Sequence, residues 1–522
     1  MTPPAHSPFQ ALTADILGER ARISPARTAL VCVETGRRFT YAQMNERAIR
    51  CARMLSLACG MEMGDRFAVL SGNRVEFLDL FGAAAKTGTV LVALNKEYTA
   101  HELSFILNDA GVKTLFYERD LSATIEELRR EGVVQHFVCL DEPMDARDLS
   151  YNAACDSAEG KAWTAAPCHV ETLCCLLYTS GTTGKPKGVM IPHRMIAFNG
   201  YNTALCWQLR ETDVSSVFTP LYHAGGLFAF LVPIWTAGGT IVLHREFQPG
   251  AVWRTIESER VTVALGVPTI IQMLLDAPEF ASASRVHIRW FISGGAPLPG
   301  GLVEAYHRRG LVLKQGFGMT EVGVNCFTMS EKEALAKIGS VGKPMLFTQA
   351  RIVHASGRLC LPEEVGEIQF RGPHVCQGYW NNDAATKQSI DEDGWFHTGD
   401  LARQDGDGFF YISGRSKDMY ISGGVNVYPA EIELELLTHP EIKDAAIVGV
   451  TDPVWGEVGA AYVVARSPEN PPSDLAAFLA ARVAKFKIPK SFHFVSELPR
   501  TAYGKVLKHA LRNPAESEKS SQ

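Results

Sequence analysis

Short apolar segments of two kinds alternate along the first two-thirds of the chain, and this alternation constrains its fold most strongly. Residues 66–70 are typical of a buried strand, 75–86 carry apolar side chains at helical spacing, and 89–93 return to a strand pattern. A helix near 101–109 and a strand at 114–117 continue the series. Because strands that alternate with helices favour parallel sheets covered by helices, we predict an α/β fold.

The same alternation recurs in the middle of the chain. With helical segments such as 269–275 between them, further strands are predicted at residues 214–218, 240–243, 261–267, 290–292 and 312–314. Since 522 residues exceed one ordinary hydrophobic core, we expect more than one domain.

The pattern changes near residue 414, where the run Gly414–Asp418 is polar and turn-like. Shorter and more mixed elements follow, namely a helix at 430–438 behind Pro429, strands at 445–450 and 460–464, and a helix at 474–485. Proline fits the first position of a helix. We therefore predict a large N-terminal domain over 1–415 with parallel-type sheets flanked by helices. A small, mobile α+β C-terminal domain is expected over 416–522, a common domain size.

Charge and cysteine content narrow the class of protein. The 51 Lys and Arg residues against 57 Asp and Glu residues leave a net charge of −6, which gives no reason to expect nucleic acid. The twelve cysteines form no C-x-x-C pair, and adjacent Cys174 and Cys175 lie in an apolar run, where we expect core packing. Scattered thiols are typical of a reduced, cytoplasmic protein. We predict neither a secretory signal at the N-terminus nor an integral membrane segment.

A loop of nine residues, made only of Thr, Ser, Gly, Lys and Pro, runs from Thr179 to Lys187 between two apolar segments. Its glycines let the backbone aim several N–H groups at one point, while hydroxyls add donors and lysines add positive charge. This chemistry suits a polyphosphate, although the spacing is not that of a P-loop. A solvated turn between two strands has a similar composition, and composition alone favours that interpretation.

A second candidate segment follows the strand predicted at 312–314. It reads Gln315-Gly316-Phe317-Gly318-Met319-Thr320-Glu321. An aromatic ring between glycines at the carboxyl end of a parallel strand lies where ligands bind in open α/β folds. Phe317 is then placed to stack on a purine, Thr320 to donate to a phosphate, and Glu321 to hold Mg²⁺. A turn with a buried Phe and an exposed Glu explains this segment alone equally well.

Other candidates have equally plain alternatives. Gly294, Gly295 and Ala296 follow the strand at 290–292 and leave room for a flat ligand, as an ordinary turn also does. Asp400 follows a glycine turn, and a carboxylate is the natural acceptor for both ribose hydroxyls. Taken alone, Arg415 is typical of a surface residue.

Taken together and in order, these motifs resemble the acyl-adenylate-forming superfamily, which comprises acyl-CoA synthetases, adenylation domains of nonribosomal peptide synthetases and beetle luciferases. The run from Thr179 to Gly188 is similar to the phosphate loop of that family. Matching segments continue from about residue 10 to 511, at Leu94-Asn95, Glu102-Leu103, Gly366-Glu367-Ile368, Gly378-Tyr379-Trp380, Ser422–Pro429, Asp452 and Trp455–Glu457. Phe317 stands where Tyr is common, and Tyr503 where a small hydroxyl residue is common, yet neither removes a required group.

The resemblance implies an ATP site. Residues implied to contact the nucleotide are Thr179, Ser180, Gly181, Thr182, Thr183, Gly184, Lys187, Gly294, Gly295, Ala296, Gln315, Gly316, Phe317, Gly318, Met319, Asp400, Ile412 and Arg415. Thr320, Glu321 and Lys505 are implied to be catalytic: Glu321 holds Mg²⁺, and Lys505 bridges the substrate carboxylate and the α-phosphate.

The resemblance also implies sites for an acid and for coenzyme A. His223 is implied to be a gating residue beside the carboxylate, although taken alone it reads as a structural histidine. The acyl pocket is expected to include His223, Gly226, Leu227, Val267, Val322 and Gly323. The CoA contacts are expected to include Gly423, Gly424, Trp455, Phe486 and Lys490, and the hinge is expected at Asp418 within 416–418. Because the neighbouring side chains are apolar and none is a dedicated cation, a fatty, aromatic or terpenoid-like acid is favoured.

The implied reaction has two halves. A carboxylate attacks the α-phosphorus of MgATP to give acyl-AMP and pyrophosphate, and the thiol of CoA then attacks the acyl carbon to give a thioester and AMP. We predict an acyl-CoA synthetase. A stand-alone adenylating enzyme that loads a separate carrier protein and a luciferase-like oxidase remain open. A non-catalytic nucleotide sensor is disfavoured by the intact Lys505, Glu321 and Thr320. The oligomeric state is also open, with a homodimer among the options.

Overall fold

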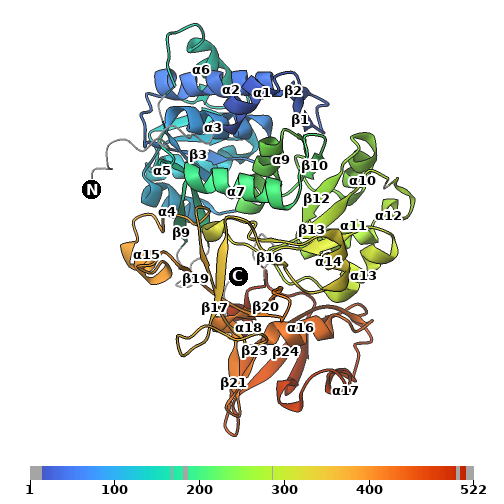
Figure 1. The fold of residues 1–522 in the computed structure, drawn as a ribbon. Coiled ribbons are helices and arrows are strands. Elements are labelled where there is room, and N and C mark those ends of the chain that lie inside the picture. The colour runs from blue at the N-terminus through green and yellow to red at the C-terminus, as the bar shows by residue number, and fades with distance from the viewer. Residues whose placement is uncertain (1–14, 166–167, 180–185, 285, 501–505, 513–522) are drawn as a thin grey trace.

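In a computed structural model, the described residues form two large helix-covered sheets, two smaller sheets and one two-stranded sheet (Figure 1). It describes residues 15–165, 168–179, 186–284, 286–500 and 506–512. In Figure 1 the elements after residue 415 lie together at the bottom, below the larger body. The predicted α/β class, with a smaller α+β part at the C-terminal end, is confirmed.

Sheet I is the seven-stranded sheet that begins with the predicted strand at 66–70. Its strands in spatial order are β7 (Leu149–Ser150), β6 (His136–Cys139), β5 (Val112–Tyr117), β3 (Arg66–Leu70), β4 (Val90–Leu94), β8 (Leu173–Thr179) and β9 (Lys187–Pro192). All neighbours are parallel except the β8–β9 hairpin. Every residue of β4 is buried, as expected for a strand with helices on both faces.

The helices of sheet I begin and end at recognisable signals. They are α2 (Tyr41–Arg53), α3 (Val75–Thr87), α4 (Ala100–Ala110), α5 (Ser122–Glu131) and α6 (Tyr151–Ser157), with α1 (Ile16–Ile23) packed on α2. α4 starts with a capping box in which Thr99 and Glu102 satisfy each other's backbone N–H groups. α3 ends at Gly88, whose φ of 71° is the left-handed conformation that stops a helix.

Sheet II holds the strands predicted in the middle of the chain. Its order is β14 (Leu313–Gln315), β13 (Trp290–Ser293), β12 (Val263–Gly266), β10 (Val214–Val217), β11 (Thr240–Leu243), β1 (Thr28–Cys32) and β2 (Arg38–Thr40). The first six are mutually parallel. Around it lie α9 (Val232–Ala237), α10 (Pro249–Ser258), α11 (Pro268–Asp276), α12 (Glu279–Ser282), α13 (Gly300–Arg308) and α14 (Glu331–Ala336), with α7 (His193–Cys206) crossing between the two sheets (Figure 1).

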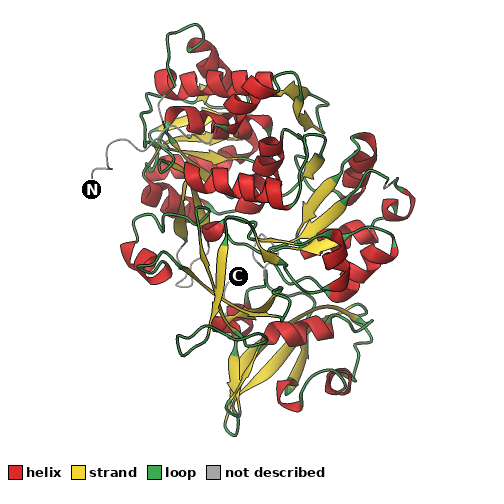
Figure 2. Ribbon diagram, in the orientation of Figure 1, coloured by secondary structure: helices red, strands yellow, loops and turns green. Residues whose placement is uncertain are grey.

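Two smaller sheets complete the molecule, and all their strand pairs are antiparallel except β24 and β25, which pair in parallel (Figure 2). Sheet III contains β17 (Gln349–Val353), β18 (Gly366–Arg371), β19 (Phe396–Gln404) and β20 (Phe410–Arg415), and it is flanked by α15 (Asp383–Ser389) and by the pair β15 (Phe327–Thr328) and β16 (Lys343–Pro344). Sheet IV contains β22 (Val425–Val427), β21 (Tyr420–Ser422), β24 (Gly456–Ala465), β23 (Ile442–Asp452) and β25 (Ser491–Phe494), with α16 (Pro429–Leu436), α17 (Leu475–Ala480) and α18 (Lys508–Arg512).

One predicted helix is shorter in the structure than expected. The helix expected over 474–485 ends at Ala480, and a separate 3₁₀ turn, η7 (Lys485–Lys487), follows. Leu475 and Leu479 are buried in the core under sheet IV, and Val483 packs on the same core after the chain has turned. Tertiary packing therefore overrides the local helix preference. Pro429 stands in the first turn of α16, as predicted.

Burial agrees with the other expectations. Cys174 and Cys175 are buried, and the cysteines of the described ranges are free thiols. Within those ranges no helix combines the length and apolar character that crossing a membrane requires.

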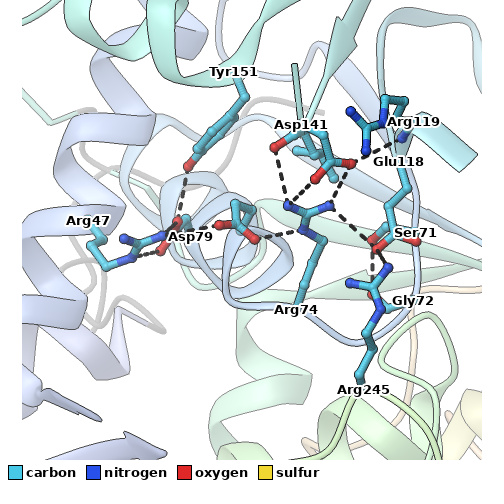
Figure 3. Close-up of polar contacts among 12 residues, drawn as sticks. Arg47, Ser71, Gly72, Arg74, Asp79, Glu118, Arg119, Asp141, Tyr151 and Arg245 are labelled. Atoms are coloured by element: carbon cyan, nitrogen blue, oxygen red, sulfur yellow. Dashed lines mark hydrogen bonds and ion pairs between the residues drawn. The ribbon is translucent and has the colours of Figure 1, made fainter. Parts of the chain in front are cut away.

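A network of charged side chains extends from Arg47 on α2, through Asp79 and Arg74 at α3, to Arg245 after β11 of sheet II (Figure 3). Arg47 donates to both carboxylate oxygens of Asp79, at 2.9 and 2.6 Å, and the Tyr151 hydroxyl donates to the same carboxylate at 3.0 Å. Burial raises the pKa of Asp79 to about 6, while Arg47 beside it opposes that rise. Arg47 and its partners thus tie α2 and α6 to α3.

We expect Asp79→Ala to reduce the free energy of unfolding by about 3–5 kcal/mol, because it leaves an interior guanidinium and hydroxyl without their acceptor. The matched control is Asp156→Ala. It removes the ion-pair partner of Arg50, which lies on α2 as Arg47 does. The Asp156 side chain is 64% exposed against 1% for Asp79, so the control should lose less than about 1 kcal/mol. Urea titrations measure both, and equal losses would contradict the importance of the buried pair.

Candidate active site

Four of the predicted site segments follow neighbouring strands of sheet II at one edge. The loop with His223 follows β10, Val267 follows β12, Gly294 and Gly295 follow β13, and Phe317 follows β14. Because these strands are parallel and adjacent, their carboxyl ends face the same side. The structure therefore brings together segments that are about 100 residues apart in the sequence.

The two glycine turns touch each other. Ser293 and Gln315 are register partners, and the Gly316 N–H donates to the Ser293 carbonyl at 2.7 Å. A Cβ on Gly294 would lie 3.6 Å from the Gly316 carbonyl oxygen. The half-buried ring of Phe317 stacks on Phe370 of β18, with centroids 6.1 Å apart and an interplanar angle of 20°. Sheet III therefore supports one face of the ring that was predicted to stack on a purine.

The segment after Phe317 depends on two further glycines. A Cβ on Gly318 would lie 2.3 Å from the carbonyl oxygen of Val324, so no other residue fits without moving the backbone. Gly323 has a φ of 71°, in the left-handed region. Behind this turn, the Nδ1 of His374 hydrogen-bonds with the carbonyl of Val322. Burial lowers the pKa of His374 to about 4, so its ring is neutral.

Glu321 is a buried carboxylate held by a tyrosine. It lies on the 3₁₀ turn η5 (Thr320–Val322), and the Tyr379 hydroxyl donates to its Oε1 at 3.2 Å. Burial, and secondarily the charge of Glu321, raise the pKa of Tyr379, so this hydroxyl keeps its proton. The sequence analysis singled out Gly378-Tyr379-Trp380 as a segment that matches the family, but it assigned no role to Tyr379 and did not predict its contact with Glu321.

The strands around the predicted phosphate loop meet the same tyrosine. Thr179 at the end of β8 pairs with Lys187 at the start of β9, and Val189 pairs with Tyr379. The ammonium of Lys187 lies 5.2 Å from the centre of the Tyr379 ring. The predicted contacts Ser180, Gly181, Thr182, Thr183 and Gly184 lie outside the described residues. Lys187 and Glu321 thus contact one side chain, the first at its ring and the second at its hydroxyl.

Asp400 and Arg415 lie opposite each other in sheet III. They are register partners on β19 and β20, and the Arg415 Nε is 3.3 Å from an oxygen of Asp400, which is buried. Ile412 on β20 packs against the core cluster that Phe317 also contacts. These three residues, all predicted to contact the nucleotide, therefore lie on the sheet that supports Phe317.

The residues predicted for the acyl pocket differ in how deeply they are buried. Leu227 and Val322 are fully buried, and Gly226 is so close to Pro220 that a Cβ there would lie 2.1 Å from the Pro220 carbonyl oxygen. Val267 is half-buried, and its Cγ1 lies 3.6 Å from the Cβ position of Gly295. His223 begins the short helix α8 (Ala224–Gly226), where its Nδ1 accepts from the Gly225 N–H at 3.2 Å.

Three of the predicted CoA residues gather on sheet IV. The Gly423 N–H donates to the Trp455 carbonyl at 2.8 Å, and the Lys490 ammonium lies 5.6 Å from the centre of the Trp455 ring. Gly424 has a φ of 81° and nothing within 4 Å of its Cβ position. Phe486 is 41% exposed on η7, four residues before Lys490.

The segment that carries Lys505 lies outside the described residues, but its flanks are placed. Arg500 and Val506 form an antiparallel bridge, and the Leu507 N–H donates to the Pro499 carbonyl at 2.8 Å. The Lys508 ammonium lies 2.6 Å from a carboxylate oxygen of Glu433 on α16. Asp418 lies on the 3₁₀ turn η6 (Ser416–Asp418) directly after sheet III.

Comparison with known families and proteins points to one family. Residues 17–380 match the model of the AMP-binding enzyme family, and residues 431–505 match that of the AMP-binding enzyme C-terminal domain. The feruloyl-CoA synthase of Amycolatopsis sp. is 39% identical over 94% of this chain and 97% of its own length. The long-chain-fatty-acid–CoA ligase FadD13 of Mycobacterium tuberculosis is 36% identical over 95% of this chain and 97% of its own length.

A solved structure shares the fold over nearly the whole chain. ATP-bound MatB from Rhodopseudomonas palustris has a TM-score of 0.87 at 31% identity and covers 97% of this chain and 100% of that one.

We expect Gly318→Ala to weaken ATP binding at least about tenfold, because the new methyl group must displace the turn that carries Phe317 and Glu321. Gly301→Ala is the matched control, since nothing lies within 4 Å of its Cβ position on α13. Calorimetric titration with ATP measures both variants. An unchanged affinity in Gly318→Ala would show that this close approach does not shape the site.

Proposed function

Since this chain belongs to the AMP-binding enzyme family and is an AMP-forming acyl-CoA synthetase, we propose that its acid is a monocarboxylate with an apolar, ring-containing body. The enzyme uses ATP, Mg²⁺ and CoA, and it is an acid–thiol ligase. A carrier-protein acceptor is not favoured, because the relatives over the full chain are CoA ligases. A cytoplasmic location, which its free thiols support, is part of the same proposal.

The observation that carries the proposed ATP site is the Lys187–Tyr379–Glu321 arrangement. The ammonium of Lys187, at the end of the phosphate loop, lies at the ring of Tyr379, and the buried carboxylate of Glu321 lies at its hydroxyl. A carboxylate is a ligand type that Mg²⁺ prefers, so Glu321 fits the metal, which when bound neutralises charge on the phosphates. Thr320 and the hydroxyls of the 179–187 loop would donate to phosphate oxygens, and Lys187 would hold the leaving pyrophosphate.

The remaining ATP contacts follow from sheet III and the glycine turns. Asp400 would accept the ribose hydroxyls, and Arg415 beside it would orient that carboxylate. The open face of Phe317 would meet the adenine, with the Gly294–Gly316 contact as the opposite wall.

We assign the two half-reactions to two positions of the C-terminal part. In the first, Lys505 would neutralise the substrate carboxylate as it approaches the α-phosphate. In the second, residues 416–522 would rotate about 416–418, so that Gly423 and Trp455 admit the CoA thiol. The Lys417 carbonyl accepts from Arg512 of α18 at 3.2 Å, so Lys417 is already attached to the C-terminal part. The proposed domain boundary is therefore residue 415.

The acid side has few charged groups. The residues assigned to it include no lysine or arginine, and His223 is the only one among them that can ionise. The Val267 Cγ1 lies 3.6 Å from the Cβ position of Gly295, beside the proposed adenine wall. We expect a planar ring to lie against this apolar pair, and the relatives named for feruloyl-CoA and indoleacetate–CoA formation support an aromatic acid.

A pyrophosphate-release screen tests this function. We expect the fastest release with arylpropenoic, benzoic and indole acids, slower release with fatty acids, and none with amino acids or dicarboxylates. Omitting CoA should leave acyl-AMP bound and stop turnover. Lys505→Ala should lose acyl-AMP formation but still convert supplied acyl-AMP and CoA to thioester. Equal loss of both half-reactions would refute the role of Lys505, and fastest release with a dicarboxylate would refute the acid class.

Tyr379→Phe tests the metal site separately. The variant keeps the ring beside Lys187 but removes the hydroxyl that donates to Glu321. We expect the Mg²⁺ concentration for half-maximal pyrophosphate release to rise about tenfold, as for loss of a hydrogen bond to a charged group. Tyr411→Phe is the control, because that hydroxyl donates to Asp405 at 3.3 Å away from Glu321. Equal Mg²⁺ dependence in both variants would contradict the assignment.

A further inference from the structure

One buried asparagine joins the two large sheets at the loop that carries His223. Asn73 lies between β3 of sheet I and α3, and it is 5% exposed. Its Nδ2 donates to the carbonyls of Thr219 and His244, at 3.0 and 3.1 Å, and its Oδ1 accepts from the Leu221 N–H at 2.8 Å. Three hydrogen bonds thus reach across from sheet I to the loops after β10 and β11 of sheet II.

The loop after β10 depends on these bonds for its shape. Between Val217 and His223 it has no regular structure, and its turn is closed by the His223 N–H on the Pro220 carbonyl at 3.1 Å. Asn73 holds the backbone on both sides of Pro220, at Thr219 and at Leu221. A buried N–H or carbonyl without a partner would cost about 1–3 kcal/mol, so losing Asn73 would favour another path for this loop.

The next residue holds Asn73 in place. Arg74 lies 2.7 Å from Glu76, 3.1 Å from Asp141 and 3.5 Å from Glu118. Figure 3 shows Arg74 beside Asp141 and Glu118, with Arg245 approaching Glu118 from the other side. The Arg245–Glu118 distance is 3.4 Å, and Arg245 follows β11 directly after His244. The start of α3 is therefore tied to sheet II by charge as well as by Asn73.

We propose that Asn73 is a positioning residue for the acid: it sets the place of the His223 loop and thereby the affinity for the carboxylic acid, without touching the nucleotide side. The inference rests on the proposed role of His223. Both ends of the amide are used, so the side chain must be a donor and an acceptor at once. An aspartate has the same shape but would place a carboxylate against two carbonyl oxygens.

The experiment compares Asn73→Ala, Asn73→Asp and Asn202→Ala in pyrophosphate release with the best acid of the screen. Asn202 is an equally buried bridge, whose Oδ1 accepts from Phe347 and whose Nδ2 donates to Thr348, in another loop. We expect both Asn73 variants to raise the KM for the acid at least about tenfold, with the KM for ATP changed less than about twofold. Asn202→Ala should leave the ratio of the two KM values unchanged.

A double-mutant cycle with His223→Ala identifies the route of the effect. If Asn73 acts through His223, the acid KM of the double variant should match that of His223→Ala within about twofold, because coupled residues are not additive. Independent, multiplying effects would overturn the inference. So would a wild-type acid KM in Asn73→Asp, or a parallel loss for acid and ATP.

Hydrogen exchange separates this inference from the proposed function. In Asn73→Ala the amides of 219–227 should exchange faster than in the wild type, while Asn202→Ala should not change them. Unchanged exchange would overturn the positioning role whatever the substrate is. If exchange rises but His223→Ala leaves the acid KM unchanged, the assignment of His223 fails and, with it, the route from Asn73 to the acid.

Discussion

Buried backbone groups where the two large sheets meet must find partners inside the protein, and the rest of the site depends on how they do so. The loops after β10 and β11 bring carbonyl and N–H groups to this junction, where Asn73 satisfies three of them. The next residue, Arg74, fixes the start of α3 through ion pairs with Glu118 and Asp141, and this keeps Asn73 in position. The relative position of the sheets is thus set by polar contacts as well as by the shared apolar core.

The turns at the carboxyl edge of sheet II also require backbone segments to pack directly against one another. Gly318 and Gly226 lie so near to neighbouring carbonyl oxygens that a methyl group would not fit. These glycines let the turns pack on one another rather than on side chains. Their function is therefore to shape the walls, whereas binding in the proposed site depends on Lys187, Glu321 and Asp400.

The sequence predicted the sheet edge well because parallel alternation dictates which loops meet. The strands 66–70 and 240–243 have the predicted bounds, and the turns at Gly294 and Gly316 touch as their strand order requires. What the sequence could not predict are contacts between segments without periodicity. Nothing local pairs Tyr379 with Glu321, or Asn73 with Leu221, which is 148 residues away. The helix expected over 474–485 was too long because packing of Val483 decided its end.

The division of contacts between sheets has a consequence for specificity. In the proposed site, the nucleotide is held by the β8–β9 hairpin, the Phe317 turn and sheet III, whereas the acid meets the loops after β10 and β12 and, at Val322 and Gly323, the end of the Phe317 turn. The His223 loop is held by a side chain from sheet I, so its path can change while the Lys187–Tyr379–Glu321 contacts stay in place. Relatives named as a feruloyl-CoA synthase and a long-chain-fatty-acid–CoA ligase match 94% and 95% of this chain. In the proposed site, an acid loop held separately from the ATP contacts would let the acid change while the nucleotide contacts stay the same.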